Sequence, residues 1–198
     1  MLYASGQFDE ATRVAKLAVA RKPDCEGGYY LLGRALFASG RYQELADIAD
    51  VAIQASGEDY NVYSPIQNAL GALGKAEAHK NIRARRTQAL EVHLRKVPED
   101  VRARMMVGID YAGAGRVEDA TREVGLAAAL RPDDPIVLYN AACAFCMMPK
   151  IPEAIDALKK AWEAGFRDPD WARRDPDLLP LHGHPEFERL YPPTNTAP

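Results

Sequence analysis

The strongest constraint on the fold is a spacing of 34 residues that recurs along the chain. Small and aromatic residues both return at this interval, and helix formers fill the stretches between them. The positions that keep the interval are Gly6, Gly40 and Gly74; Phe8 and Tyr42; Ala18 and Ala52; Tyr29 and Tyr63; Pro98 and Pro132; Gly108 and Ala142; Tyr111 and Phe145; Ala120 and Ala154; and Ala127 and Ala161. Such a period without alternation at every second residue predicts stacked helix–turn–helix units.

One step departs from this interval. Gly74 and Gly115 are 41 residues apart, seven more than the repeat. Seven residues make about two helical turns, so the insertion keeps the buried face of a helix in phase. We therefore expect a long second helix over residues 75–96 instead of an inserted loop.

Three segments carry a resemblance to the tetratricopeptide repeat family. They are GGYYLLGRALFASGRYQELADIADVAIQASG, VRARMMVGIDYAGAGRVEDATREVGLAAALRPDD and PIVLYNAACAFCMMPKIPEAIDALKKAWEAGF, with Pro149 at a turn position where glycine is usual. The marked positions are Tyr29, Leu32, Gly33, Leu36, Gly40, Tyr42 and Ala52 in the first segment and Val107, Gly108, Tyr111, Gly115, Ala120, Ala127 and Pro132 in the second. The resemblance implies an all-α, right-handed superhelical stack of antiparallel helix pairs, an α-solenoid.

The end of the chain adds a narrower resemblance. YNAACAFC, AIDALKKAWEAGF and the DPDW, DPDLLPL and HPEFERL segments resemble C-terminal repeat regions of bacterial adenylate cyclase or serine/threonine kinase-type signalling proteins. The similarity spans about residues 90–190. It points to a region of such proteins and implies no catalytic activity, because no cyclase or kinase motif is present in the sequence.

The repeat marks predict the domain organisation. We expect a half repeat at 1–25, repeats at 26–59, 60–100, 101–134 and 135–165, a capping segment at 166–191 and a disordered tail at 192–198. The half repeat suggests a fragment or C-terminal region of a longer protein, because end repeats normally need a cap. In the capping segment, Asp168-Pro169 and Asp175-Pro176 predict two short helices, and His184-Pro185 starts a third. Residues expected to cover the last repeat are Trp171, Leu178, Leu181, Phe187 and Leu190.

Composition and charge limit the classes of function that this chain can have. A net charge of -3 over 198 residues does not favour nucleic acid or an acidic membrane as partner. Three cysteines are too few for a disulfide framework, and no apolar run approaches membrane-spanning length, so a cytoplasmic protein is expected. No nucleophile–base or paired-carboxylate arrangement predicts an enzyme, and no cofactor is expected.

The first helix of each pair lines the concave groove in proteins of this type, which predicts a ligand groove. Amides and guanidinium groups there could hold a peptide backbone or carboxylate, while aromatic and apolar side chains supply contact area. The candidates are Tyr30, Arg34, Phe37, Asn61, Ser64, Asn68, Arg102, Met105, Ile109, Tyr139 and Asn140, with Cys143 and Cys146 further along the last of these helices. The alternative is that several of them only pack between helices. The family's carboxylate clamp is not expected, because Tyr30, Ser64 and Met105 stand where its lysines would be.

Two other groups of residues invite hypotheses about metal or redox chemistry. Cys143 and Cys146 form a CxxC, but the pair lies in the middle of a predicted helix and has no second CxxC, which favours packing. His182 and His184 lie near the cap with no acidic or cysteine cluster aimed at them. We therefore expect no metal site.

Residues 75–96 carry seven basic and two acidic residues, a local charge of +5, so the rest of the chain carries -8. Arg83, Arg85 and Arg86 would form a secondary basic surface for an acidic or phosphorylated partner; a solvated helix face is the alternative. Nucleic acid is not favoured because no aromatic residues interleave with the basic ones.

Two functions follow from these patterns. The first is a scaffold that binds a protein or peptide segment in the groove, or joins copies of the chain through the open N-terminal face. The second is a regulatory module of a larger bacterial signalling protein.

Overall fold

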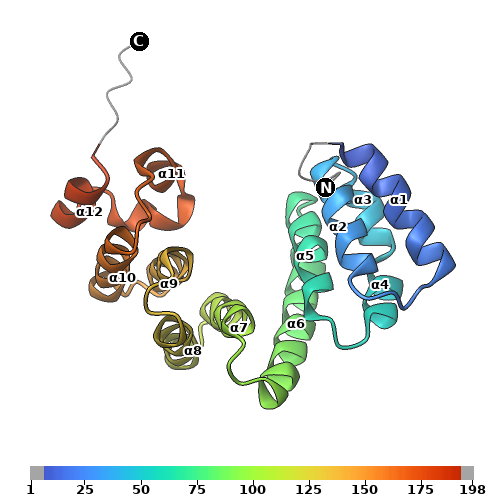
Figure 1. Cartoon of the computed structure of the whole chain (residues 1–198), viewed down its shortest axis with the longest axis horizontal. Helices are drawn as coiled ribbons and strands as arrows, with labels where there is room; N and C mark the ends of the chain where they lie inside the picture. The colour runs from blue at the N-terminus through green and yellow to red at the C-terminus, as the bar shows by residue number, and fades with distance from the viewer. Residues whose placement is uncertain (1–6, 193–198) are drawn as a thin grey trace, which may run out of the picture. The chain divides into compact units, whose positions relative to one another are not determined.

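The computed structural model describes residues 7–192, and every regular element in that range is helical (Figure 1). Gly6 of the predicted half repeat and residues 193–198 of the predicted tail lie outside the described residues. The chain forms two compact units that divide after His93. The all-α repeat stack predicted from the 34-residue spacing is therefore the observed fold class.

The first unit combines several short or medium helices with most of one long helix. They are α1 (Phe8–Arg21), α2 (Gly28–Ala38), α3 (Tyr42–Asp47), α4 (Ala49–Ser56), the 3-10 helix η1 (Tyr60–Val62), α5 (Tyr63–Ala72) and α6 (Ala76–Lys96). The core is formed by apolar side chains from α1 to α6, among them Leu36, Leu45, Ile66 and Ile82. Helix α6 has 21 residues and occupies the stretch for which the seven-residue excess predicts a long helix.

The recurring turn glycines have a common backbone geometry. Gly74 and Gly115 have φ angles of 67° and 75°, in the left-handed region that glycine adopts without a Cβ penalty. In each turn the next amide donates to a carbonyl five residues earlier, Lys75 to Leu70 and Arg116 to Tyr111, at 3.0 and 2.9 Å. This hydrogen bond closes the helix C-terminus in the Schellman manner, which explains why glycine returns at the repeat spacing.

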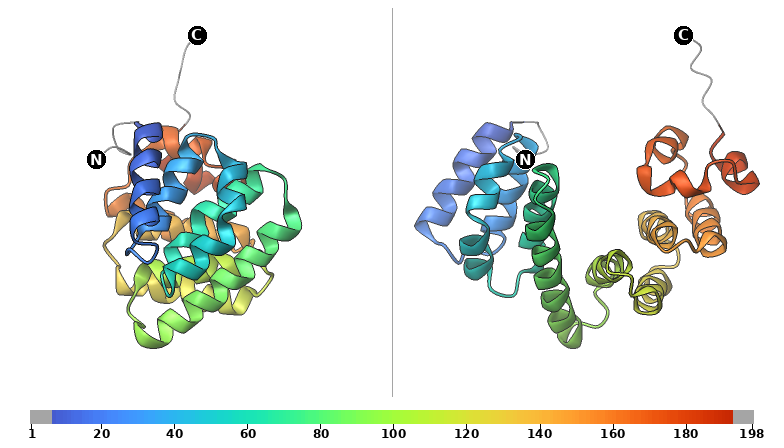
Figure 2. Two further views of the ribbon diagram at one scale, coloured as in Figure 1. Left: turned by 90° about the vertical axis from the view of Figure 1, so that its right-hand side faces the viewer. Right: turned by 180° about the vertical axis from the view of Figure 1, so that it is seen from behind.

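The second unit contains two regular helix pairs, α7 (Val101–Gly113) with α8 (Val117–Leu130), and α9 (Pro135–Met147) with α10 (Ile151–Glu163). Figure 2 shows the same pairs from two further directions. A Cβ placed on Gly108 would lie 2.7 Å from Val124 Cγ2, so the small residue permits the close approach of α7 and α8. Arg104 and Glu123 join the same two helices through an ion pair of 2.5 Å.

Three short elements follow α10 and cap the second unit: α11 (Pro169–Arg174), the 3-10 helix η2 (Pro176–Leu181) and α12 (Pro185–Leu190). The side chains of Asp168, Asp175 and His184 accept hydrogen bonds from backbone amides at the starts of these elements, as N-caps do. Leu178, Leu181, Phe187 and Leu190 are buried as expected. The same expectation for Trp171 is wrong, because its side chain is 60% exposed.

Candidate binding groove

Six of the residues predicted to line a ligand groove lie in the first unit. On α2, the Arg34 guanidinium lies 5.7 Å from the centre of the Tyr30 ring, and Phe37 packs against Tyr42 with ring centres 5.1 Å apart. Asn61 belongs to η1, where its side-chain amide donates to Asp59 at 2.9 Å. Each of these side chains contacts a neighbour in the same unit. Their positions therefore do not define a ligand site.

The other two predicted groove residues of the first unit, Ser64 and Asn68, lie on α5. Ser64 Oγ accepts a hydrogen bond of 3.5 Å from Arg86 Nη1, while Asn68 is exposed. Ser64 therefore has a partner inside the fold, and Asn68 is the member of this pair that a ligand could reach.

The other five predicted residues lie in the second unit. Arg102 is exposed on α7, but Met105 on the same helix is only 7% exposed and packs in the interior. The prediction that Met105 faces a ligand is therefore wrong. The structure brings Ile109, Tyr139 and Asn140 together.

These three residues line a groove of about 320 Å³ in the second unit. Its walls come from α7, α9, α11, η2 and the segments between them. The lining residues are Ile109, Ile136, Tyr139, Asn140, Cys143, Phe166, Asp168, Trp171, Asp175 and Asp177. Ile136 and Trp171 are 55% and 60% exposed, so the groove presents large apolar side chains to solvent beside the amide of Asn140. We call this set of residues the acidic groove.

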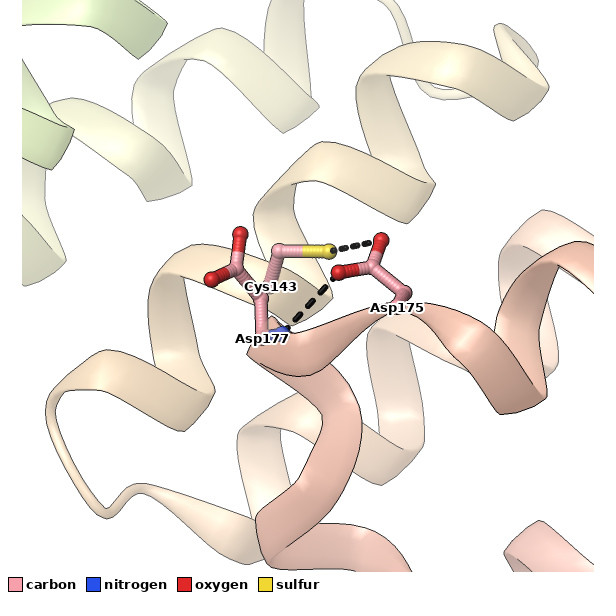
Figure 3. Close-up of side chains that lie close together, drawn as sticks. All are labelled: Cys143, Asp175 and Asp177. Carbon is pink, nitrogen blue, oxygen red and sulfur yellow. Dashed lines mark hydrogen bonds between the residues drawn. The ribbon is translucent and has the colours of Figure 1, made fainter. Parts of the chain in front are cut away.

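A hydrogen-bonded cluster connects the wall of the acidic groove to η2 (Figure 3). The Tyr139 hydroxyl donates to Asp175 Oδ2 at 2.7 Å, and the Cys143 thiol donates to the same oxygen at 3.8 Å. Asp175 Oδ1 accepts the backbone N–H of Asp177 at 2.9 Å. The Tyr139 ring also stacks on Phe166, with centroids 4.1 Å apart. Tyr139 is only 4% exposed, so it acts mainly as a rigid support for the groove.

The charges of the acidic groove are all negative. Asp168, Asp175 and Asp177 line it, and no basic side chain of the described residues does. Asp168 and Asp175 serve as N-caps, whereas the Asp177 carboxylate has no hydrogen bond or ion pair within residues 7–192. Burial, followed by repulsion from Asp175, raises the pKa of Asp177 above its ordinary value. The groove thus holds negative charge that the fold does not neutralise.

Cys143 Sγ and the carboxylates of Asp175 and Asp177 place three possible ligand atoms within 4.8 Å of one another. The chemistry of this set fits a metal poorly. Burial, followed by the nearby carboxylates, raises the pKa of the Cys143 thiol, so a metal would have to displace its proton on binding. Both Asp175 oxygens already accept hydrogen bonds. The cluster is better explained as support for the groove wall.

The CxxC and the two histidines have structural roles. Cys143 and Cys146 are free and buried in the last part of α9, near its C-terminus and not in the middle of the helix as expected, and burial raises the pKa of Cys146 to about 12. His184 caps α12 by accepting the Glu186 amide at 3.2 Å, and the His182 ring stacks on Phe187. These contacts account for the four residues through packing and capping.

The predicted basic surface on α6 has a different arrangement from the one expected. Arg86 is only 8% exposed and donates to Ser64, so it does not belong to a surface. Arg85 pairs with Asp50 at 2.7 Å, and Arg83 is partly buried. Arg86 is therefore engaged inside the fold, and Arg85 is engaged in an ion pair at the surface.

A second hollow of about 640 Å³ lies between α8, α9 and α10. Small side chains such as Ala128 and Ala157 line it together with the acidic side chains of Asp133, Glu153, Asp156 and Glu163. Glu153 pairs with Lys150 and Asp156 pairs with Lys160, at 3.1 and 2.7 Å. Although larger, this hollow lacks the exposed aromatic side chain of the acidic groove.

Sequence reasoning missed the residues that give the acidic groove its charge. Asp168 and Asp175 are recognisable as N-caps, and Asp177 follows in the same DPD motif. No local pattern predicts that η2 returns to α9, because Tyr139 and Asp175 are 36 residues apart. None of the described helices is long and apolar enough to cross a membrane.

No model of a known protein family matches the chain, and no curated protein matches it. Solved structures do resemble it. TTC0263, a thermophilic TPR protein in Thermus thermophilus, is 23% identical with a TM-score of 0.65, over 87% of this chain and 91% of that one. YrrB, a TPR protein with an unusual peptide-binding site, is 19% identical with a TM-score of 0.52, over 83% and 81%.

A MamA structure from Desulfovibrio magneticus RS-1 is 18% identical with a TM-score of 0.56, over 82% of this chain and 88% of that one. None of these comparisons supports the narrower resemblance to cyclase- or kinase-type signalling proteins. What they establish, together with the helix pairs and turn glycines, is that this chain has the tetratricopeptide repeat fold.

Proposed function

We propose that this protein is a binding module that holds a peptide or protein segment in the acidic groove. The observation that carries the proposal is an open groove whose lining includes exposed Trp171 and Ile136, Asn140 and an unpaired carboxylate, Asp177. Exposed aromatic residues are typical anchors of binding sites, and an amide can pair with both polar groups of a peptide backbone. The peptide-binding site named for YrrB supports the same use of this fold.

A selection of random peptides displayed on phage, with the full chain as bait, tests this proposal. We expect enriched peptides whose affinity falls about tenfold or more in Trp171→Ala, because an anchor residue is lost. Leu179→Ala is the matched control, since Leu179 is 59% exposed in the same capping segment but does not line the groove. Peptides that bind both variants equally well would place the binding site elsewhere.

Arg34 and Asn68 of the first unit stay candidates for a second contact with the partner. Both are on the helices predicted to face a ligand, and Asn68 is exposed. A double Arg34→Ala, Asn68→Ala variant should bind a long partner segment more weakly than the wild type. Its helical content, measured by circular dichroism, should not change. An unchanged affinity would restrict the binding site to the second unit.

A further inference from the structure

The acidic groove combines two features that a single kind of side chain can satisfy. One is the close pair of carboxylates from Asp175 and Asp177, which lie within 4.8 Å of each other and of Cys143 Sγ. The other is an aromatic lining from exposed Trp171 and partly buried Phe166. A ligand that fits both must carry positive charge and present a flat face.

The negative charge at this end of the groove is uncompensated. None of the three groove aspartates makes an ion pair with a described residue, whereas two of the four acidic residues that line the larger hollow, Glu153 and Asp156, have a lysine partner. The pKa of Asp177 is raised because burial and the nearby Asp175 both disfavour its charged form, which agrees with the lack of a cationic partner. A cation that enters the groove would remove this repulsion.

Arginine matches the pair of features better than lysine. Its planar guanidinium can donate to carboxylates through parallel hydrogen bonds and can stack on an aromatic face. Lysine offers a compact, strongly hydrated charge that suits the carboxylates but gains less from the aromatic lining. Trp171 is exposed enough for such stacking, and tryptophan is the best aromatic partner for a cation.

We propose that the acidic groove selects a segment bearing an arginine side chain, whose guanidinium pairs with Asp177 beside Asp175 and packs against Trp171. The inference rests on the proposed function, since it names the chemistry of the segment held in the groove. The apolar side chains of Ile109 and Ile136 then contact the residues next to that arginine.

The test uses three pools of acetylated, amidated pentapeptides with mixed apolar residues around a fixed central residue. The central residue is arginine, lysine or citrulline, which keeps the shape of arginine without its charge. Titration into the full chain, followed by tryptophan fluorescence, should show the arginine pool binding about tenfold more tightly than the citrulline pool. The affinity of the lysine pool should lie between those of the other two pools. Added NaCl should lower the affinity of the arginine pool more than that of the citrulline pool.

Variants connect the charge preference to the groove. Asp177→Asn should remove most of the difference between the arginine and citrulline pools, because the unpaired carboxylate is lost. Asp133→Asn makes the same change in net charge on an exposed aspartate outside the acidic groove, and it should leave the difference intact. A chelator should have no effect, whereas loss of binding with chelator would favour a metal at Cys143, Asp175 and Asp177.

The outcomes separate this inference from the proposed function. Equal binding of the arginine and citrulline pools overturns the arginine preference, while a shared loss in Trp171→Ala would still support groove binding. Tighter binding of the lysine pool, or of peptides with a free N-terminus over acetylated ones, also overturns it and assigns the site to an ammonium group. If no pool binds and phage selection yields only groove-independent peptides, both proposals fail.

Discussion

The basic helix α6 and the acidic groove each concentrate charge of one sign, and charged groups in the two regions differ in whether they have partners within the fold. On α6, Arg86 is buried against Ser64 and Arg85 pairs with Asp50. In the acidic groove, Asp177 has no partner in the described part of the chain, and its pKa is raised. The sequence shows the charge of α6 more clearly, but the structure shows unsatisfied charge in the groove.

This contrast shows that local net charge alone is a weak guide to binding. A charge that is paired within the fold has already lost much of its capacity to attract a partner. A buried or repelled charge without a partner destabilises the free protein slightly. A ligand of opposite charge removes that cost, so such a charge contributes more to binding. The following predictions test that contrast from the largest expected effect to the smallest.

Replacement of Arg86 should have the largest effect on stability. Arg86→Glu places an opposite charge at a site that is 8% exposed and removes the hydrogen bond to Ser64. We expect a loss of about 3 kcal/mol in the free energy of unfolding, the size typical of a disrupted buried charge. Urea denaturation followed by circular dichroism measures it. An unchanged midpoint would mean that Arg86 belongs to the surface after all.

Removal of the Tyr139 hydroxyl tests the support of the acidic groove. Tyr139→Phe keeps the ring stacked on Phe166 but takes away the hydrogen bond to Asp175. Loss of a buried hydrogen bond to a charged acceptor should lower stability by about 1–2 kcal/mol. Thermal unfolding gives the change, and Tyr29→Phe is the control, because Tyr29 is only partly buried and lies in the first unit. Equal stability of wild type and Tyr139→Phe would show that the cluster does not hold η2.

Much of the fold could be predicted because its signals are local. Turn glycines, Asp-Pro caps and small residues at helix contacts each act within a few residues of where they appear. The position of Arg86 was also visible, because Ile82, Arg86 and Leu90 are four residues apart and share one face of α6. A count of basic residues takes no account of which helix face each residue lies on. It therefore assigns Arg86 to a surface although Arg86 lies on the buried face.

The acidic groove was only partly predictable for the opposite reason. Ile109, Tyr139 and Asn140 follow from the repeat pattern, because the first helix of each pair supplies them. Trp171 and Asp177 come from the capping segment, whose short elements have no repeat to set their register. Trp171 was expected to be covered because large apolar residues usually are. Its exposure depends on the path of the chain after Gly165, which no local pattern specifies.

Neutralisation of Asp177 should raise stability at neutral pH by a small amount. Its folded pKa is raised, so its favourable contribution is present at low pH and is lost as pH rises through that pKa. Asp177→Asn should therefore unfold at a slightly higher temperature than wild type at pH 7. The difference should vanish near pH 3, below the ordinary aspartate pKa of about 3.9. A lower unfolding temperature at pH 7 would show that Asp177 has a stabilising partner.

The smallest effect is expected at Arg85, the exposed counterpart of Arg86 on the same helix. Arg85 and Asp50 are 38% and 87% exposed, so water and salt screen their ion pair of 2.7 Å. Arg85→Glu should cost less than about 1 kcal/mol, and most of that loss should disappear at high salt. The charge-swapped double variant Arg85→Glu, Asp50→Arg should recover it, because the pair is restored in reverse. A cost as large as that of Arg86→Glu would mean that exposure does not separate these two arginines. The different partners of Arg86 and Arg85 would then need a cause other than burial.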